Sequence, residues 1–245
     1  MKSMVFASRN SKELLRDPLN LAFMIGFPLV VLFLFSIIGA NAPESVFEVG
    51  NMAPGVAVFG YSFIALFSGT LISKDRTTSF LMRLFTTPLR ASDFIIGYIL
   101  PLLPMAILQS AICFIASIFL GLKVSINLLL ALVVLIPAAA LFIGIGLLVG
   151  SIFNDKQVGG ICGALLTNLS AWLSGAWFDV RLVGGVFETI AYLLPFTHAV
   201  DAAKAAISGD YASILPHLLW VVGYAVIILT VAIVIFKKKM NSDKV

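Results

Sequence analysis

Charged residues are scarce in this 245-residue chain. Asp, Glu, Lys and Arg make up 11% of the residues and hydrophobic residues 60%, which leaves too little polar side chain to cover a water-soluble surface. The few charges lie almost wholly between long uncharged stretches, and a charge near the centre of a bilayer costs about 2.5 to 3.5 kcal/mol. The composition therefore excludes a soluble domain and indicates an integral membrane protein.

Cysteines are few, and a phosphate-binding lysine motif is absent. Cys113 and Cys162 lie in uncharged stretches without a histidine or second cysteine at metal-binding spacing, so neither a disulfide framework nor a metal site is predicted. No Gly-Lys pair occurs, which excludes the G-x-x-x-x-G-K-[ST] loop that cradles nucleotide phosphates. We expect no catalytic residues and no cofactor bound by this chain.

A serine hydrolase within the membrane is also disfavoured. Ser174-Gly175 together with His198 or His217 would supply the residue types of a catalytic dyad. The G-x-S-G pattern of such enzymes, however, needs a glycine where Trp172 stands, and both histidines fall outside the cores of the uncharged stretches. A serine that packs between helices is the favoured interpretation of Ser174.

Six uncharged stretches of about 20 residues or more are present. Each is long enough to cross about 30 Å of hydrocarbon as a helix. We therefore predict one all-α transmembrane domain over residues 1–245, with six transmembrane helices at about 19–39, 52–73, 94–120, 124–153, 157–178 and 211–236. A further uncharged stretch at 189–200 is too short to cross and fits an outer re-entrant or interfacial segment.

The span cores contain few polar residues. They hold no Asp, Glu, Lys, Arg or His, which disfavours coupling to proton or sodium movement. Gln109, Asn168 and Ser174 either line a substrate path or hydrogen-bond between helices. Interhelical hydrogen bonds contribute about 0.6 to 2 kcal/mol in membranes, and this favours the packing role.

The distribution of basic residues predicts the orientation. With six spans, thirteen Lys or Arg residues fall on the side of both termini and three, Lys123, Arg181 and Lys204, on the other. Basic residues are retained in cytoplasmic loops, so we expect both termini in the cytoplasm. The same rule explains the net charge of +4, and no nucleic-acid partner is predicted.

Two cytoplasmic segments carry apolar residues among charges. In the connection 74–93, Phe80, Leu81, Leu84 and Phe85 share one helical face, and Pro88 stops that helix near Thr87. This face packs either on lipid headgroups or on a soluble partner. Residues 1–16 form either an amphipathic helix at the membrane interface or a solvated tail.

Small residues predict close helix packing and the end of an outer helix. They recur at four-residue spacing as Ala140 with Gly144, Gly146 with Gly150, and Gly159 with Gly163, a spacing that lets helix backbones approach in lipid. Outside the membrane, Val200, Ala203 and Ile207 share one face of a helix predicted over 197–209, with Gly209 just past its end.

Several short segments, distributed in order over nearly the whole chain, carry a family resemblance. They are Arg16-Asp17-Pro18, Lys74-Asp75-Arg76, Leu84-Phe85-Thr86-Thr87-Pro88-Leu89-Arg90, Leu173-Ser174-Gly175 and Leu194-Pro195-Phe196-Thr197-His198-Ala199-Val200-Asp201-Ala202. Together they resemble type-2 ABC exporter permeases, the bacterial drug and antibiotic export class. The chain departs from the family pattern at Thr77-Thr78-Ser79, where Gly-Thr is usual, and at Asp179-Val180-Arg181, where a proline-rich stretch is usual.

The resemblance implies partners and a place in the cell. In that family two permease subunits or halves pair with two ATPase subunits, which bind ATP and magnesium. It implies a homodimer or heterodimer of permeases in the bacterial inner membrane. It also implies that residues 79–87 form a cytoplasmic coupling helix that contacts the ATPase through Phe80, Arg83, Leu84, Phe85, Thr86 and Pro88.

The function implied is ATP-driven export of an amphipathic or hydrophobic substrate by alternating access. We further predict that the outer segment dips into the membrane and forms part of an exit gate, with Pro195, Phe196, Thr197 and Val200. The alternative is a membrane scaffold that recruits a soluble partner through the same loop without transport. Partner-stimulated ATP hydrolysis distinguishes the two.

Overall fold

The computed structural model describes residues 2–41, 49–78, 80 and 90–242. All regular elements of this part of the chain are helices, as predicted, and no strand occurs in it. In chain order they are α1 (Lys2–Leu15), α2 (Pro18–Leu21), η1 (Ala22–Gly26), α3 (Phe27–Asn41), α4 (Val49–Thr77), α6 (Ala91–Phe119), α7 (Asn127–Val134), α8 (Ile136–Ile152), α9 (Asp155–Val158), η3 (Gly159–Leu166), α10 (Thr167–Leu173), α11 (Val180–Val183), α12 (Gly185–Leu193), α13 (Pro195–Ser208) and α14 (Tyr211–Ser242).

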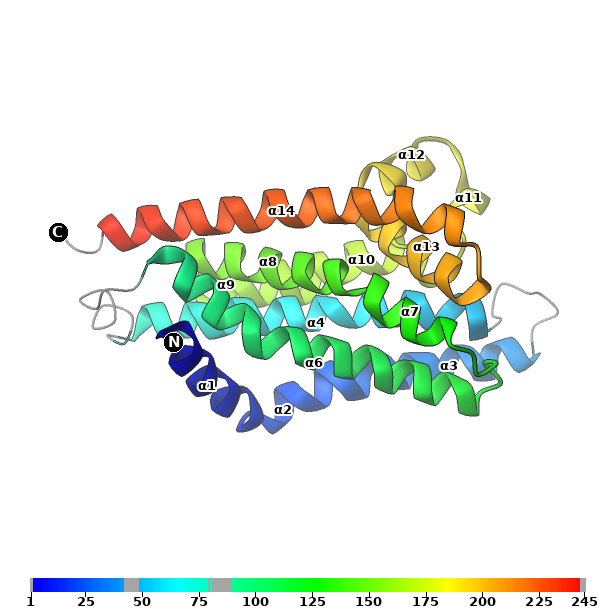
Figure 1. The fold of residues 1–245 in the computed structure, drawn as a ribbon, viewed down its shortest axis with the longest axis horizontal. Helices are drawn as coiled ribbons and strands as arrows, with labels where there is room; N and C mark the ends of the chain where they lie inside the picture. Colours follow the sequence, from blue (N-terminus) through cyan, green and yellow to red (C-terminus); the bar gives the residue numbers. More distant parts are fainter. Residues whose placement is uncertain (1, 42–48, 79, 81–89, 243–245) are drawn as a thin grey trace.

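Five helical segments among the described residues are long and apolar enough to cross a membrane. They are Pro18–Ala40, Val49–Thr77, Ala91–Phe119, Asn127–Ile152 and Tyr211–Lys239. These correspond to five of the six predicted spans, and the long helices run side by side as an elongated bundle (Figure 1).

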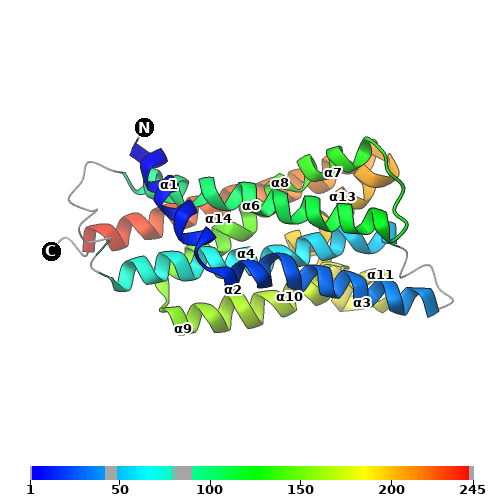
Figure 2. The same ribbon diagram turned by 90° about the horizontal axis from the view of Figure 1, so that it is seen from below.

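The span predicted at 157–178 is not among these five segments. It is helical over 155–173, but as three consecutive elements, α9, the π-helix η3 and α10. A π-helix has wider i to i+5 hydrogen bonds in place of i to i+4 bonds. This composite segment runs alongside α4 (Figure 2) and packs against it. Its membrane crossing stays a prediction.

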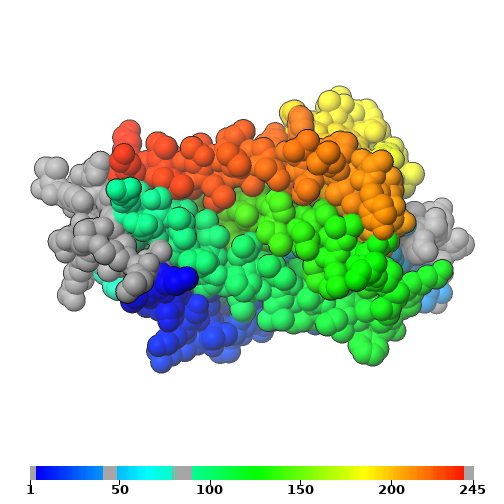
Figure 3. All heavy atoms as spheres, viewed as in Figure 1, coloured from blue at the N-terminus to red at the C-terminus, as the bar shows by residue number. Residues whose placement is uncertain are grey.

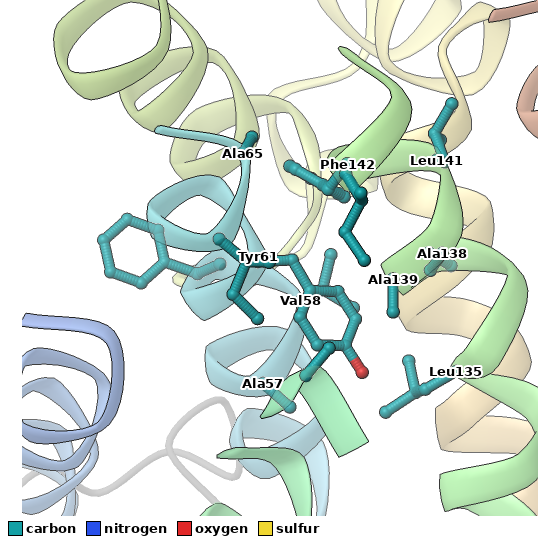
Figure 4. Close-up of a cluster of buried hydrophobic side chains, with 14 of the residues drawn as sticks. Ala57, Val58, Tyr61, Ala65, Leu135, Ala138, Ala139, Leu141 and Phe142 are labelled. Carbon is teal, nitrogen blue, oxygen red and sulfur yellow. The ribbon is translucent and has the colours of Figure 1, made fainter. Parts of the chain in front are cut away.

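Helix α4 occupies the centre of the bundle. It packs against α3, α6, α8 and α13, and most of its residues are buried. Figure 4 shows Tyr61 of α4 directed at Leu135 and Ala139 on the α8 side. The Tyr61 hydroxyl hydrogen-bonds Ser110 Oγ on α6 at 2.6 Å, so the phenol is satisfied within the bundle.

Helices α4 and α8 approach each other closely. An added Cβ would lie 2.0 Å from the Ala65 carbonyl oxygen at Gly146, and 2.2 Å from the Gly69 carbonyl oxygen at Gly150. The predicted close packing is confirmed for this pair. In the third pair, a Cβ on Gly163 would lie 3.3 Å from the Leu66 side chain of α4, whereas a Cβ on Gly159 would meet no atom within 4 Å.

The predicted outer helix over 197–209 is confirmed as α13. It begins at Pro195, whose fixed φ suits a first helical position, and ends before Gly209 at φ 83°. Val200 and Ala203 are fully buried on the face that was predicted. Together with α11 and α12, this helix lies at the end of the bundle away from both termini (Figure 1).

Large apolar side chains remain exposed along the bundle. Helix α14 forms a continuous ridge along one edge of the molecule (Figure 3). Its exposed residues include Leu215, Leu219, Val226, Ile227 and Val234. Such a surface is unfavourable in water but is compatible with lipid acyl chains. The multi-pass membrane assignment therefore rests on the surface as well as on helix length.

Candidate functional site

Helix α1 packs against α6 beside the end of α4 that precedes the predicted coupling segment. Both chain termini lie toward this end of the bundle (Figure 1). We call the cluster that joins these helices the α1 clamp, and it consists of Phe6, Arg9, Asn10, Asp75, Phe80 and Tyr98. Its residues come from α1, α6, the last turns of α4 and Phe80 just beyond it.

The centre of the α1 clamp is an ion pair. The Arg9 guanidinium donates to both carboxylate oxygens of Asp75, at 2.7 and 2.8 Å. Asp75 is only 2% exposed, and it also accepts a 2.7 Å hydrogen bond from the Tyr98 hydroxyl. A buried carboxylate is stable only when it is paired and hydrogen-bonded in this way. Arg9 is held in turn by Glu13, one helical turn further along α1.

Aromatic packing completes the α1 clamp. The Phe6 ring contacts Tyr98 and Phe94 edge-on, with centroids 4.9 and 5.6 Å apart. It also stacks on Phe80 at 6.4 Å. Gly97 makes room for Phe6, because a Cβ there would lie 2.4 Å from the Phe6 ring. The buried Asn10 side chain donates to the Gly97 carbonyl oxygen at 3.1 Å.

Phe80 is the one predicted coupling residue that the structure describes. Its ring is half-buried, and the Arg9 guanidinium carbon lies 4.3 Å from the ring centroid. Arg9 therefore contacts both Asp75, at the buried end of α4, and Phe80, just beyond that end. The other predicted coupling residues, Arg83, Leu84, Phe85, Thr86 and Pro88, lie outside the described residues.

Arg76, which follows Asp75 in α4, binds the opposite side of the bundle. Arg76 donates to the carbonyl oxygens of Gly150 and Phe153, at 2.8 and 3.4 Å. These carbonyls belong to the C-terminal end of α8, where a cation is favourable for the helix dipole. Consecutive residues, Asp75 and Arg76, thus connect the end of α4 to α1 and α6 on one side and to α8 on the other.

The α1 clamp was not found from the sequence. Residues 1–16 fitted either an interfacial helix or a solvated tail, and the structure shows a helix with Leu14 buried and Met4, Val5 and Leu15 exposed. The available signal was an acidic residue, Asp75, in the last turns of an apolar helix. Such a carboxylate requires a partner if it is buried, but the sequence does not say that Arg9 is that partner.

The polar residues predicted within the spans occupy three different environments. Gln109 is fully buried against Gly60 of α4, donates weakly to Cys113 Sγ at 3.4 Å, and leaves its Oε1 without a partner in the described structure. Asn168 is exposed and donates to the Ala164 carbonyl oxygen of its own helical segment. Ser174 is buried and accepts from the Ala176 N–H at 3.2 Å. The structure does not bring these three together into one path.

The predicted gate residues are buried at the start of α13. Phe196 packs against Phe142 of α8, with ring centroids 5.4 Å apart. The Thr197 hydroxyl hydrogen-bonds the carbonyl oxygens of Leu173 and Ala191, and Pro195 and Val200 are also buried. These contacts anchor α13 to α8, α10 and α12. Whether the segment enters the membrane stays a prediction.

The histidines have partners other than Ser174. His198 Nε2 lies 2.9 Å from the Tyr192 carbonyl oxygen, so this nitrogen must donate. His198 Nδ1 lies 2.7 Å from His217 Nδ1. Because both ring nitrogens of His198 are engaged elsewhere, and Ser174 bonds within its own turn, the geometry gives no support to a serine hydrolase.

Comparison with known proteins agrees with this membrane architecture. A family model described as "ABC-2 type transporter" matches residues 2–207. The match begins within α1 and ends in α13, so it includes both sides of the α1 clamp. No curated protein matches the chain.

Proposed function

The chain belongs to the ABC-2 type transporter family, as the membrane-spanning permease subunit of an ABC transporter, and we propose that it works as an ATP-driven exporter. In this proposal it moves an amphipathic or hydrophobic substrate outward by alternating access. A separate ATPase subunit binds ATP and magnesium and supplies the energy. A second permease subunit, identical or different, completes the membrane part.

The α1 clamp is the observation that supports coupling to an ATPase. The segment 79–87 follows α4, whose end is fixed to three helices through Asp75 and Arg76. Displacement of that segment by a partner would therefore be passed directly to α1, α6 and α8. A loop that moved freely relative to the bundle would lose this motion before it reached the membrane.

The proposed orientation places the α1 clamp in the cytoplasm of a bacterial cell, at the inner membrane. Thirteen of the sixteen basic residues then lie on the cytoplasmic side. This count requires that the segment 155–173 crosses the membrane as a sixth span. Nineteen residues in purely α-helical geometry would rise about 29 Å at 1.5 Å each, close to the hydrocarbon thickness, and the π-helix η3 makes the segment somewhat shorter.

At the outer end, α12 and α13 are proposed to dip into the membrane and to form part of an exit gate. Helix α12 has nine residues, too few to cross, and α13 is anchored to the bundle by Thr197 and Phe196. Gln109, Asn168 and Ser174 are the polar positions at which a substrate path is most readily tested. Gln109 is the strongest of them, because its Oε1 lacks a hydrogen-bond donor in the described structure.

Reconstitution distinguishes an exporter from a membrane scaffold. The chain would be co-expressed with a candidate ABC ATPase subunit, and the complex would be placed in proteoliposomes. An exporter stimulates ATP hydrolysis and loses transport when the ATPase carries a hydrolysis-deficient substitution. A scaffold retains the ATPase on purification but shows no substrate-dependent hydrolysis, and that result would contradict the proposed function.

A further inference from the structure

A polar cavity lies at the end of the bundle away from the termini. Its volume is about 390 Å³, and it is lined by the connection between α10 and α11 together with residues of α4, α11, α12 and α13. The end where these short helices gather is visible in Figure 1. The volume is within the range of small-molecule sites, and neither the α1 clamp nor the proposed coupling segment takes part in it.

Two hydrogen-bond donors that line the cavity lack acceptors. The Trp177 Nε1 is buried and has no hydrogen-bond partner in the described structure. Lys204 is half-buried, and no carboxylate of the described residues lies within 4.0 Å of its ammonium. Burial lowers the pKa of Lys204, and the charges of Asp201 and Asp179 oppose this shift without a direct ion pair. A half-buried ammonium without a directly bound acceptor is unfavourable, and a bound anion would supply one.

A third donor, Arg181, lies at the same cavity. Its Nε donates to the Tyr192 hydroxyl at 3.0 Å, and that hydroxyl donates to Asp201 at 3.2 Å. This arrangement fixes the arginine through one nitrogen only, and within the described part of the chain its two Nη atoms make no hydrogen bond. The planar guanidinium is therefore available for two parallel bonds to one anion.

The two acids of the cavity are already engaged. Asp179 accepts the backbone N–H of Arg181 at the start of α11, and Asp201 accepts from Tyr192. Each carboxylate thus has a donor, whereas Lys204 and Trp177 have no acceptor. This difference favours an anionic ligand, because an anion would supply the acceptors that Lys204 and Trp177 lack.

We propose that this cavity binds a phosphate-type anion, held by Lys204, Arg181 and the Trp177 indole N–H. A phosphate has several acceptor oxygens and can meet three donors from different directions, whereas a carboxylate has only two oxygens. The phosphate belongs either to a membrane lipid headgroup or to a soluble molecule. The proposal does not depend on transport or on the ATPase.

The test uses the full chain in a non-ionic detergent without added lipid. Its thermal unfolding is followed while one of three probes is titrated, namely dihexanoylphosphatidylglycerol, dihexanoylglycerol, which lacks the phosphate, and inorganic phosphate. A ligand that binds the folded state raises the unfolding midpoint in a saturable manner. We expect saturation with a phosphate-bearing probe and none with dihexanoylglycerol.

Three variants locate the binding. Lys204→Gln and Arg181→Gln should each weaken apparent affinity by about tenfold, since each removes a charge-assisted hydrogen bond. Lys123 is an exposed cation that does not line this cavity. Its replacement in Lys123→Gln should change the apparent affinity by less than about twofold. Arg181 is exposed, so its replacement should not impair folding.

The probes also identify the source of the phosphate. Saturation by the lipid alone assigns the site to a headgroup, and saturation by inorganic phosphate assigns it to a soluble molecule. Both results support the site provided that the cavity variants weaken binding. Unchanged affinity in Lys204→Gln and Arg181→Gln, or equal stabilisation by dihexanoylglycerol, would overturn the proposal.

Discussion

Arg9 and Asp75 are separated by 66 positions in the sequence, yet the guanidinium of one donates two hydrogen bonds to the carboxylate of the other. The pair connects the first helix of the chain to the last turns of the most buried one. Without Arg9, Asp75 would be a buried, uncompensated charge, so the end of α4 depends on the position of α1. The reverse dependence holds as well, because Asp75 supplies the carboxylate that binds Arg9 of α1.

The first prediction concerns this ion pair. Arg9→Gln should destabilise the detergent-solubilised chain by about 3 kcal/mol, because it leaves the Asp75 carboxylate buried without its cation. This expected destabilisation is at the low end of the range for buried ion pairs because Arg9 is partly exposed. Asp75→Asn in the Arg9→Gln background should restore part of the loss. Thermal unfolding of the two single variants and the double variant gives the interaction.

Lys12→Gln is the matched control on the same helix. Lys12 is exposed, so its replacement should change the unfolding free energy by less than about 0.5 kcal/mol. Equal effects of Arg9→Gln and Lys12→Gln would mean that the ion pair does not hold α1 in place. Strict additivity of the Arg9 and Asp75 variants would lead to the same conclusion.

The second prediction tests the contact between α4 and α8. Gly146→Ala should destabilise the chain by about 1 to 3 kcal/mol, because its Cβ would overlap the backbone of Ala65 and the two helices must separate. Gly223→Ala, on a part of α14 where no atom lies within 4 Å of an added Cβ, should leave thermal stability unchanged or slightly higher. A Gly146→Ala protein as stable as Gly223→Ala would disprove the close approach.

The third prediction concerns orientation. Reporters fused after Lys239 or inserted within 74–93 should report a cytoplasmic location, and one within 41–50 an external one. The expectation follows from the count of thirteen basic residues against three. A cytoplasmic signal from the insertion at 41–50 would rule out six spans with cytoplasmic termini. An external signal from the fusion after Lys239, with 41–50 also external, would rule out the crossing at 155–173.

The fourth prediction concerns pH at the outer end. Burial lowers the pKa of His198, and a second proton would also place an N–H on Nδ1, facing His217. The unfolded chain, with an ordinary pKa of about 6.5, then binds more protons than the folded chain. The contribution of His198 to the free energy of unfolding is therefore fully present above about pH 6.5 and declines as the pH falls below that value.

Thermal unfolding between pH 7.5 and pH 5 measures this effect. His198→Gln removes the titrating group, so its unfolding midpoint should fall less steeply with acid than that of the unaltered chain. Identical slopes in the two proteins would show that the histidine contact does not contribute to acid sensitivity. Titrating groups that do not interact with His198 contribute equally to both proteins and cancel in the comparison.

The sequence predicted those features that depend on local pattern. Uncharged length located five helices that the structure contains, and Val200, Ala203 and Gly209 located the face and end of α13. The α1 clamp could not be predicted from local pattern, because helical periodicity shows that Arg9 and Asp75 lie on helices but not that those helices meet. The π-helix at Gly159–Leu166 was missed for a related reason, since hydropathy does not distinguish i to i+5 from i to i+4 bonding.

One variant directly tests whether the segment 79–87 couples the permease to an ATPase. Leu84→Asp places a charge on the face predicted to dock, where burial of an apolar side chain contributes about 1.5 to 3 kcal/mol. Leu84→Met, which keeps an apolar side chain of similar volume, is the matched control. Both variants must be inserted in the membrane at the level of the unaltered chain.

The measurement is substrate-stimulated ATP hydrolysis by the complex in proteoliposomes, with co-purification of the ATPase recorded in parallel. We predict that Leu84→Asp abolishes both and that Leu84→Met retains both. Normal stimulation and transport by Leu84→Asp would contradict the assignment of this segment, and with it the proposal that motion enters the bundle beside Asp75.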